Sequence, residues 1–482
     1  MTAARMQCNQ QVGIAPTPNE FDAHFMTQRL QVPCPAQRSM AVSMPRSRRG
    51  RRYNDDAQWF QRVFTPSAHR IREQESSVSR AATMGNLTES SYRAAWPDFS
   101  CYRPHPAAAQ LREWLGDAQR LTATLTRHCD DANAKVPMLA IVNPPLWELG
   151  HLAWFEEFWL HRGGNFQSPS LLAGADHWYD SARVGHDSRW TLDLPDFTAT
   201  RAYAAAVHER SMALLEGGET ADELAYFAQL AIFHQDMHNE AFSYTWQTLG
   251  LEMPARLPEA ALTAAVDIDI PGGTLMLGAS PAGGFVFDNE KWAHEVKLQP
   301  FTIASQVVSN AAFLAFVEDH GYTRQAFWGA AGWSWRERLA LRHPRYWQRE
   351  DNRWTVRRFD RQMPLPMNDS LTHVSAHEAE AYCRWAGRRL PSEAEWQRAA
   401  SNAGGHFEYG QVWEWTSSRF LPFAGFSPDP YAEYSAPWFE EEHRVLRGGS
   451  FATPRRLMRP GFRNFYNPDR ADMFCGFRTC GQ

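Results

Sequence analysis

Apolar side chains recur at intervals of three and four over much of the first half of the chain, as they do in amphipathic helices. Four segments carry this pattern: 106–129, 143–162, 197–217 and 220–250. The second is expected to begin at Pro145, because proline is well tolerated in the first helical turn. Thr220 is the expected N-cap of the fourth, and Gly250 is its expected end. Joined by loops, the longest at 163–196, these segments predict a four-helix bundle.

The pattern changes near residue 254. From there on glycine, tryptophan and short alternating stretches dominate, and only 309–322 and 375–387 look helical. Few regular elements and many glycine turns predict a compact α+β domain rich in loops. The predicted fold class is therefore multidomain, with an α domain over 95–255 followed by an α+β domain over 265–482.

Composition and charge argue against several classes of protein. The chain has 482 residues, of which 44% are apolar and 21% charged, enough for more than one hydrophobic core. It contains no apolar run of about eighteen residues and no secretory signal pattern, so we expect neither a membrane span nor export. Seven scattered cysteines form no disulfide framework, which is typical of the reducing cytoplasm. The formal charge of -5 gives no reason to expect a nucleic-acid partner.

The N-terminal stretch differs from the rest of the chain. Residues 1–83 hold twelve Arg, no Lys and six Asp or Glu, and include RSRRGRR at 46–52. Without a sustained apolar period, residues 1–90 are predicted to form a disordered, Arg-rich leader. A basic nucleic-acid-binding or targeting arm is one interpretation. The interpretation we favour is a non-essential leader before Met84.

Two histidines stand four residues apart in the fourth predicted helix, in FHQDMHNE. Side chains at i and i+4 share one face of a helix, so His234 and His238 can reach a common point. His151 lies on the second predicted helix, and facing helices of a bundle commonly supply metal ligands. Three neutral imidazoles suit Zn, Ni or Fe(II) and leave positions open for catalysis. The spacing alone is also compatible with ordinary core or surface histidines.

Two acidic residues neighbour the histidine pair. Asp236 and Glu240 do not share its helix face, so a carboxylate is not expected to replace a histidine as ligand. Glu240 is expected to orient a ligand or to balance its charge. HQDMH also lacks the glutamate that follows the first histidine in zinc proteases.

Longer stretches resemble known families. GHLAWFEE and HQDMHNE in a helical frame resemble the DinB-type bundle, whose metal-binding members use three histidines in this arrangement. The later half resembles the C-type-lectin-like fold of the formylglycine-generating enzymes (sulfatase-modifying factors), in PGGTLMLG, FDNEKWAHEV, RRLPSEAEWQRAA, GQVWEWTSS, VLRGGSFAT, RPGFRN and CGFR. Together, over roughly 95–480, the halves resemble the ergothioneine-type sulfoxide synthases. NPPLWELGH and YDSARVGHDSRWTLDLP are most similar to the selenoneine synthases of that group.

This resemblance implies a cytoplasmic, non-haem iron oxidoreductase that uses O2 to join a chalcogen to hercynine, which is trimethylated histidine. It implies Fe(II) bound by His151, His234 and His238. It assigns substrate binding to Met237, Arg189, Asn464, Phe465 and Tyr466. A tyrosine of PDPYAEYS would deliver the proton, either Tyr431 or Tyr434, and Tyr431 is preferred.

Two departures from the resemblance concern the donor. The thiol-using enzymes usually read RNWD where this chain reads RNFY, so that Tyr466 takes the place of an acid. Their arginine-bearing loop after the second helix also reads differently here. Both departures favour a selenosugar, which presents hydroxyls, over γ-glutamylcysteine. The sulfur-using synthase is the alternative, and a DinB-type thiol transferase with zinc or nickel is a further one.

Overall fold

The computed structural model describes residues 96–132, 135–217, 220–255, 262–281, 283–402 and 404–482. All of them belong to one compact unit. The predicted leader over 1–90 lies outside the described residues. Among the described helices, none combines the length and the apolar content that crossing a membrane requires.

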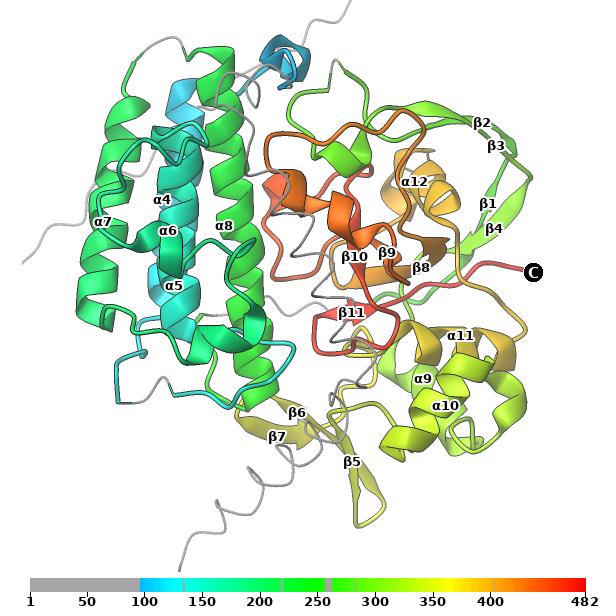
Figure 1. Cartoon of the computed structure of the whole chain (residues 1–482). Helices are drawn as coiled ribbons and strands as arrows, with labels where there is room; N and C mark the ends of the chain where they lie inside the picture. The colour runs from blue at the N-terminus through cyan, green and yellow to red at the C-terminus, as the bar shows by residue number, and fades with distance from the viewer. Residues whose placement is uncertain (1–95, 133–134, 218–219, 256–261, 282, 403) are drawn as a thin grey trace, which may run out of the picture. The chain divides into compact units, whose positions relative to one another are not determined.

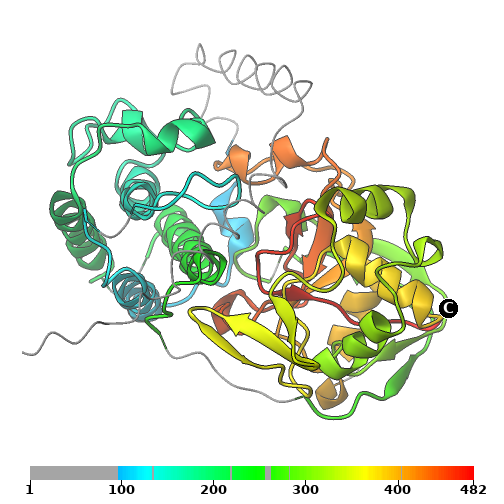
Figure 2. The same ribbon diagram turned by 90° about the horizontal axis from the view of Figure 1, so that it is seen from below.

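The first half of the described chain is helical, as its apolar pattern predicts. Its long helices are α4 (Ala108–Leu125), α5 (Pro145–Glu156), α7 (Phe197–Leu214) and α8 (Asp222–Leu249). They run side by side, with α4 packed on α8 and α5 packed on both α7 and α8 (Figures 1 and 2). Pro145 is the first residue of α5, and Gly250 ends α8 in the left-handed conformation, as expected.

The start of α8 differs from the prediction. Its N-cap is Ala221, one residue after Thr220, and no side chain caps the helix there. Asp222 and Glu223 stand in the first turn, where negative charge interacts favourably with the helix dipole. These carboxylates, rather than a threonine cap, stabilise the start of the helix.

Several short elements surround the long helices. They are the 3-10 helices η1 (Phe99–Tyr102) and η3 (His186–Trp190), the π-helical turn η2 (Glu157–His161) that continues α5, and α6 (Ala175–Trp178). The segment after α6 lies directly on α5 at Gly150. A Cβ at this position would lie 2.2 Å from the ring of Tyr179, so only glycine allows the close approach.

The described residues of the second half form short strands in four small sheets. The central sheet has the order β10 (Asn464–Tyr466), β9 (Arg444–Arg447), β8 (Trp413–Arg419) and β11 (Cys475–Gly476). Its pairs are antiparallel except for β11, which is parallel to β8. The other sheets are β1 (Asp267–Ile270) with β4 (Phe301–Ala304), β2 (Gly273–Leu277) with β3 (His294–Leu298), and β5 (Trp347–Glu350), β6 (Arg353–Arg358) and β7 (Arg361–Pro364). The α+β class that the glycine-rich texture predicts is confirmed.

The same half has more helix than its sequence pattern indicates. The expected helices are α9 (Asn310–Glu318) and α11 (Ala376–Trp385), whereas α10 (Ala330–Leu339) and α12 (Glu393–Asn402) were not predicted. For α12 a signal was present, because Ser392 and Glu395 have the spacing of a capping box. The Ser392 amide donates to the Glu395 carboxylate over 2.8 Å, and the Glu395 amide donates to the Ser392 hydroxyl over 3.2 Å.

Helix α8 joins the two halves through buried carboxylates. Asp236 accepts two hydrogen bonds of 2.6 Å from Arg456. Glu240 accepts hydrogen bonds from three residues of the second half: Trp413 at 2.9 Å, Ser450 at 2.5 Å and Thr453 at 2.6 Å. The expectation that Glu240 orients a metal ligand is therefore wrong, because its partners all belong to the domain packed on the opposite face of α8.

Candidate metal centre and active site

Three histidines from two helices meet in the interior. His151 comes from α5, and His234 and His238 come from α8. One ligand nitrogen from each lies within 4.8 Å of the others, and among the described residues this is the one such group of three His, Cys, Asp or Glu. The structure thus brings together the three residues whose spacing predicts a metal site.

The outer nitrogens of two of these rings are already engaged. His151 Nδ1 donates to the Tyr179 carbonyl over 2.7 Å, and His238 Nδ1 contacts Glu148 Oε1 at 2.6 Å. Each bond leaves Nε2 for a metal, and this is the way proteins orient histidine ligands. The three residues therefore fit a divalent transition metal. Glu148 was missed by the sequence analysis, although it stands three residues before His151 on the same face of α5.

The environment keeps His151 and His234 neutral. Burial lowers the pKa of both His151 and His234 well below its usual value, and His238 acts in the same direction. The His234 ring also stacks on Phe155, with ring centres 3.5 Å apart. Neutral imidazoles bind metal without first losing a proton, so His151 and His234 are ready to bind a cation.

Replacing Glu148 by glutamine is expected to weaken metal binding about 10- to 100-fold, because a neutral amide is a poorer partner for His238 Nδ1. Anaerobic titration with Fe(II) measures the change. Glu157→Gln is the matched control, since Glu157 is a buried glutamate on the continuation of α5 whose partners include Tyr203 and Ser170. Equal affinities in the two variants would show that His238 is oriented without Glu148.

The two candidate tyrosines reach this centre from the second half. The Tyr431 ring lies 5.0 Å from that of Phe155 and 6.2 Å from that of His234. The Tyr434 hydroxyl lies 3.7 Å from Met237 Sδ, so Met237 and Tyr434 also meet beside the histidines. Burial raises the pKa of both tyrosines above the usual value, which keeps the phenols protonated at neutral pH.

Arg189 brings a cation close to His151. Its guanidinium lies 3.9 Å above the ring of Trp147, which stacks on His151 with ring centres 4.8 Å apart. Two nitrogens donate to Asn143 Oδ1 and the Val184 carbonyl, whereas the buried Nε has no partner among the described residues. Burial lowers the pKa of Arg189 to about 10, so it remains charged at neutral pH.

The three remaining predicted residues form β10 and take different positions. Phe465 stacks on Phe420 with centres 3.9 Å apart and lies 6.1 Å from the Tyr434 ring. Tyr466 points to the other side of the strand, where it meets Tyr244 of α8, and burial raises its pKa to about 12. Asn464 Oδ1 accepts from the Phe465 amide over 2.8 Å. In the described part of the chain, no hydrogen bond links Asn464 to a histidine.

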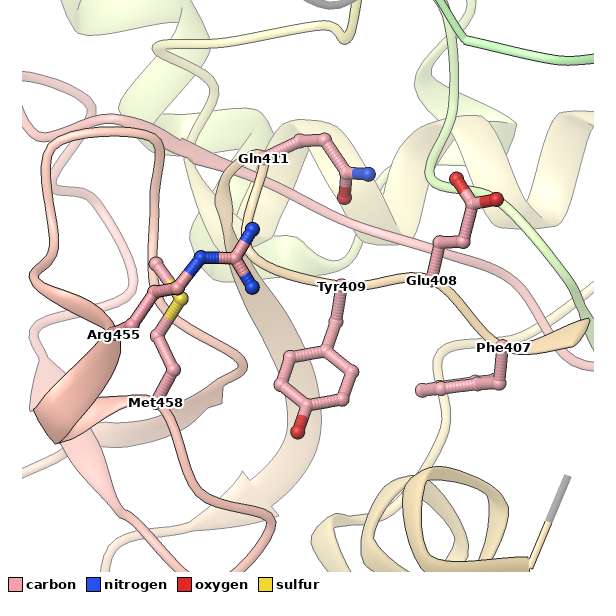
Figure 3. Close-up of a pocket in the computed structure, with 6 residues that line it drawn as sticks. All are labelled: Phe407, Glu408, Tyr409, Gln411, Arg455 and Met458. Carbon is pink, nitrogen blue, oxygen red and sulfur yellow. The ribbon is translucent and has the colours of Figure 1, made fainter. Parts of the chain in front are cut away.

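A pocket of about 450 Å³ opens elsewhere in the second half (Figure 3). None of the predicted site residues lines it. Its wall consists of Phe407, Glu408, Tyr409, Gln411, Arg455 and Met458. It is therefore separate from the metal centre.

Comparison with known proteins matches both halves. Residues 115–241 match the DinB superfamily, and 254–409 and 406–482 match the sulfatase-modifying factor enzyme 1-like domain. The chain is 32% identical over 427 residues to a hercynine oxygenase of Mycolicibacterium smegmatis, covering 76% of this chain and 98% of the relative. The chain belongs to the hercynine oxygenase family.

Two further relatives agree with this family. A hercynine oxygenase of Mycobacterium tuberculosis is 33% identical over 405 residues, which cover 72% of this chain and 93% of the relative. Ergothioneine biosynthesis protein 1 of Schizosaccharomyces pombe is 26% identical over 216 residues, which cover 38% of this chain and 26% of the relative. These matches confirm that the first half resembles DinB proteins and the second half the sulfatase-modifying factors. As a member of the hercynine oxygenase family, the chain is an enzyme of the oxidoreductase type.

Proposed function

We propose that the enzyme joins selenium from a selenosugar to the imidazole of hercynine, with Fe(II) and O2. The observation that carries the proposal is the His151, His234 and His238 group in a member of the hercynine oxygenase family. Iron held by these imidazoles would supply the redox chemistry that forming a bond at an unactivated imidazole carbon requires. The imidazole C–H and donor Se–H bonds break, the C–Se bond forms, and O2 takes up four electrons. One oxygen ends on selenium and the other leaves as water.

Hercynine would lie between the histidines and β10. Its trimethylammonium group cannot donate a hydrogen bond, so aromatic faces such as those of Phe465 and Tyr434 suit it. Its carboxylate suits Arg189, whose buried Nε has no partner within the described residues, or the amide of Asn464. Met237 stands between the two ligands of α8, where its thioether would contact the imidazole.

Tyr431 would hold and deliver the proton. Its ring packs near that of His234, and its partly buried phenol keeps its proton at neutral pH. A phenol in this position can act as a general acid toward reduced oxygen. Tyr434, whose hydroxyl contacts Met237, is the second candidate.

The features around Tyr466 support a sugar as donor. Tyr466 and Tyr244 offer hydroxyls on the α8 side of β10. The nearby Arg470 is occupied by Asp472, with hydrogen bonds of 2.6 Å and 2.7 Å, so its charge is already balanced. A donor that presents hydroxyls suits this surface better than one that presents several carboxylates.

A sulfur donor is the second candidate. The relatives named hercynine oxygenase and ergothioneine biosynthesis protein favour it. Arg189 also favours it, because a cation near the metal centre could bind the carboxylate of a cysteine-containing thiol.

Anaerobic reconstitution with Fe(II), followed by O2, hercynine and both donors in competition, tests the proposal. We expect O2 uptake with iron and not with zinc, and a product whose mass and isotope pattern show one selenium atom. A product containing sulfur in the same competition would establish the second candidate. Absence of uptake with iron, or uptake with zinc alone, would contradict both.

A further inference from the structure

Both candidate tyrosines lie within residues 429–435, which we call the tyrosine segment. Each end of this segment contacts the same stretch of the second half, η4 (Asp288–Glu290) and Lys291 directly after it. This stretch is buried, with exposed fractions of 2% for Asp288 and 8% for Lys291. It belongs to the FDNEK sequence, to which the proposed reaction assigns no role.

At the first end, a buried cation holds Asp429. Lys291 Nζ forms a short ion pair with Asp429 Oδ1 and also donates to the Tyr102 hydroxyl over 2.8 Å. Tyr102 in turn donates to the same carboxylate oxygen over 2.7 Å. Because losing one partner of a buried pair leaves an uncompensated charge, this end of the segment is firmly fixed.

At the second end, a carboxylate and an aromatic ring fix the position of the tyrosine segment. Ser435 Oγ donates to Asp288 Oδ1 over 2.5 Å. The ring of Phe287, which precedes Asp288, stacks on Tyr434 with centres 4.3 Å apart and planes 24° apart. Asp288 and Lys291, which hold the two ends, thus stand only three residues apart in the sequence.

We propose that Asp288, Lys291 and Asp429 are positioning residues that set where the Tyr431 and Tyr434 hydroxyls stand above α8. Only five residues separate the two fixed ends, so the phenols have little freedom to move away from the histidines. Misplacing a reacting group by about 1 Å can cost about 100-fold in rate. The inference rests on the proposed function, because it takes a tyrosine of the segment to serve the reaction.

Asp429→Asn and Ser435→Ala test the two ends separately. Asparagine keeps an acceptor for Tyr102 but removes the ion pair, and alanine removes the bond to Asp288. We expect kcat to fall about tenfold or more in Asp429→Asn and about threefold or more in Ser435→Ala, with the KM for hercynine within about twofold. Iron content should stay stoichiometric, and amide hydrogen exchange over 429–435 should accelerate.

Ser392→Ala is the matched control, because its hydroxyl also donates to a carboxylate, that of Glu395, at the start of α12. It should lose stability without loss of kcat. Should Asp429→Asn fail to fold, Ser435→Ala decides alone. Wild-type kcat or unchanged exchange over 429–435 would overturn the inference, as would an equal loss of kcat in Ser392→Ala. If the wild type itself consumes no O2, the proposed function fails, and exchange over the segment still decides whether these residues hold it.

Discussion

Replacing His234 by alanine is expected to abolish stoichiometric iron binding and turnover. His234 is one of three imidazoles whose ligand nitrogens lie within 4.8 Å of one another, and it comes from the interior of α8, where no neighbouring acid shares its face. Two remaining histidines would leave a first-row metal with too few protein ligands to be retained. Metal analysis after dialysis and O2 uptake measure the two losses.

His177→Ala is the matched control for this prediction. His177 lies on the short helix α6, is exposed, and does not belong to the histidine group. It should keep wild-type iron content and activity. Full iron occupancy together with turnover in His234→Ala would refute the ligand assignment.

Replacing Tyr431 by phenylalanine is expected to lower kcat about 100-fold or more, the usual contribution of a well-placed general acid. The ring would remain packed on Phe155, so the fold and the metal site should stay intact. The substitution removes the hydroxyl group, and with it the proton and the hydrogen bond to Ser181. Steady-state O2 uptake together with iron content separates the loss of kcat from a loss of metal.

Tyr434→Phe provides the comparison for Tyr431→Phe. The Tyr434 hydroxyl contacts Met237, whereas the Tyr431 ring lies 6.2 Å from that of His234, so we expect a smaller loss in Tyr434→Phe. A large loss in Tyr434→Phe with near wild-type kcat in Tyr431→Phe would reassign the proton donor to Tyr434. Equal and full activity of both variants would exclude the tyrosine segment from proton delivery.

The helical half was predictable because its apolar spacing is local. His234 and His238 stand one turn apart on α8, so their convergence follows from sequence alone. The central sheet was not predictable in the same way. β11 has two residues and pairs with β8 about sixty residues earlier, and such pairings depend on the whole domain rather than on a local pattern.

The hydrogen-bond partners of the buried acidic residues were also not predictable from the sequence. The sequence predicts that Glu240 orients a ligand or balances its charge, yet it binds Trp413, Ser450 and Thr453. Glu148, which does contact His238, is ninety residues away from it. A helix pattern tells which residues share a face, but not what the rest of the chain places against that face.

The two faces of α8 limit how the enzyme could be recombined with its relatives. Its histidines face α5, while Asp236 and Glu240 face the second half, so a chimera with a foreign second half must supply counterparts of Arg456, Ser450 and Thr453. Without these donors, the two carboxylates would be buried between the halves with no hydrogen-bond partners, which is energetically costly. The same helix therefore carries both two metal ligands and the contacts to the second half, so exchanging that half also affects the helix that binds the metal.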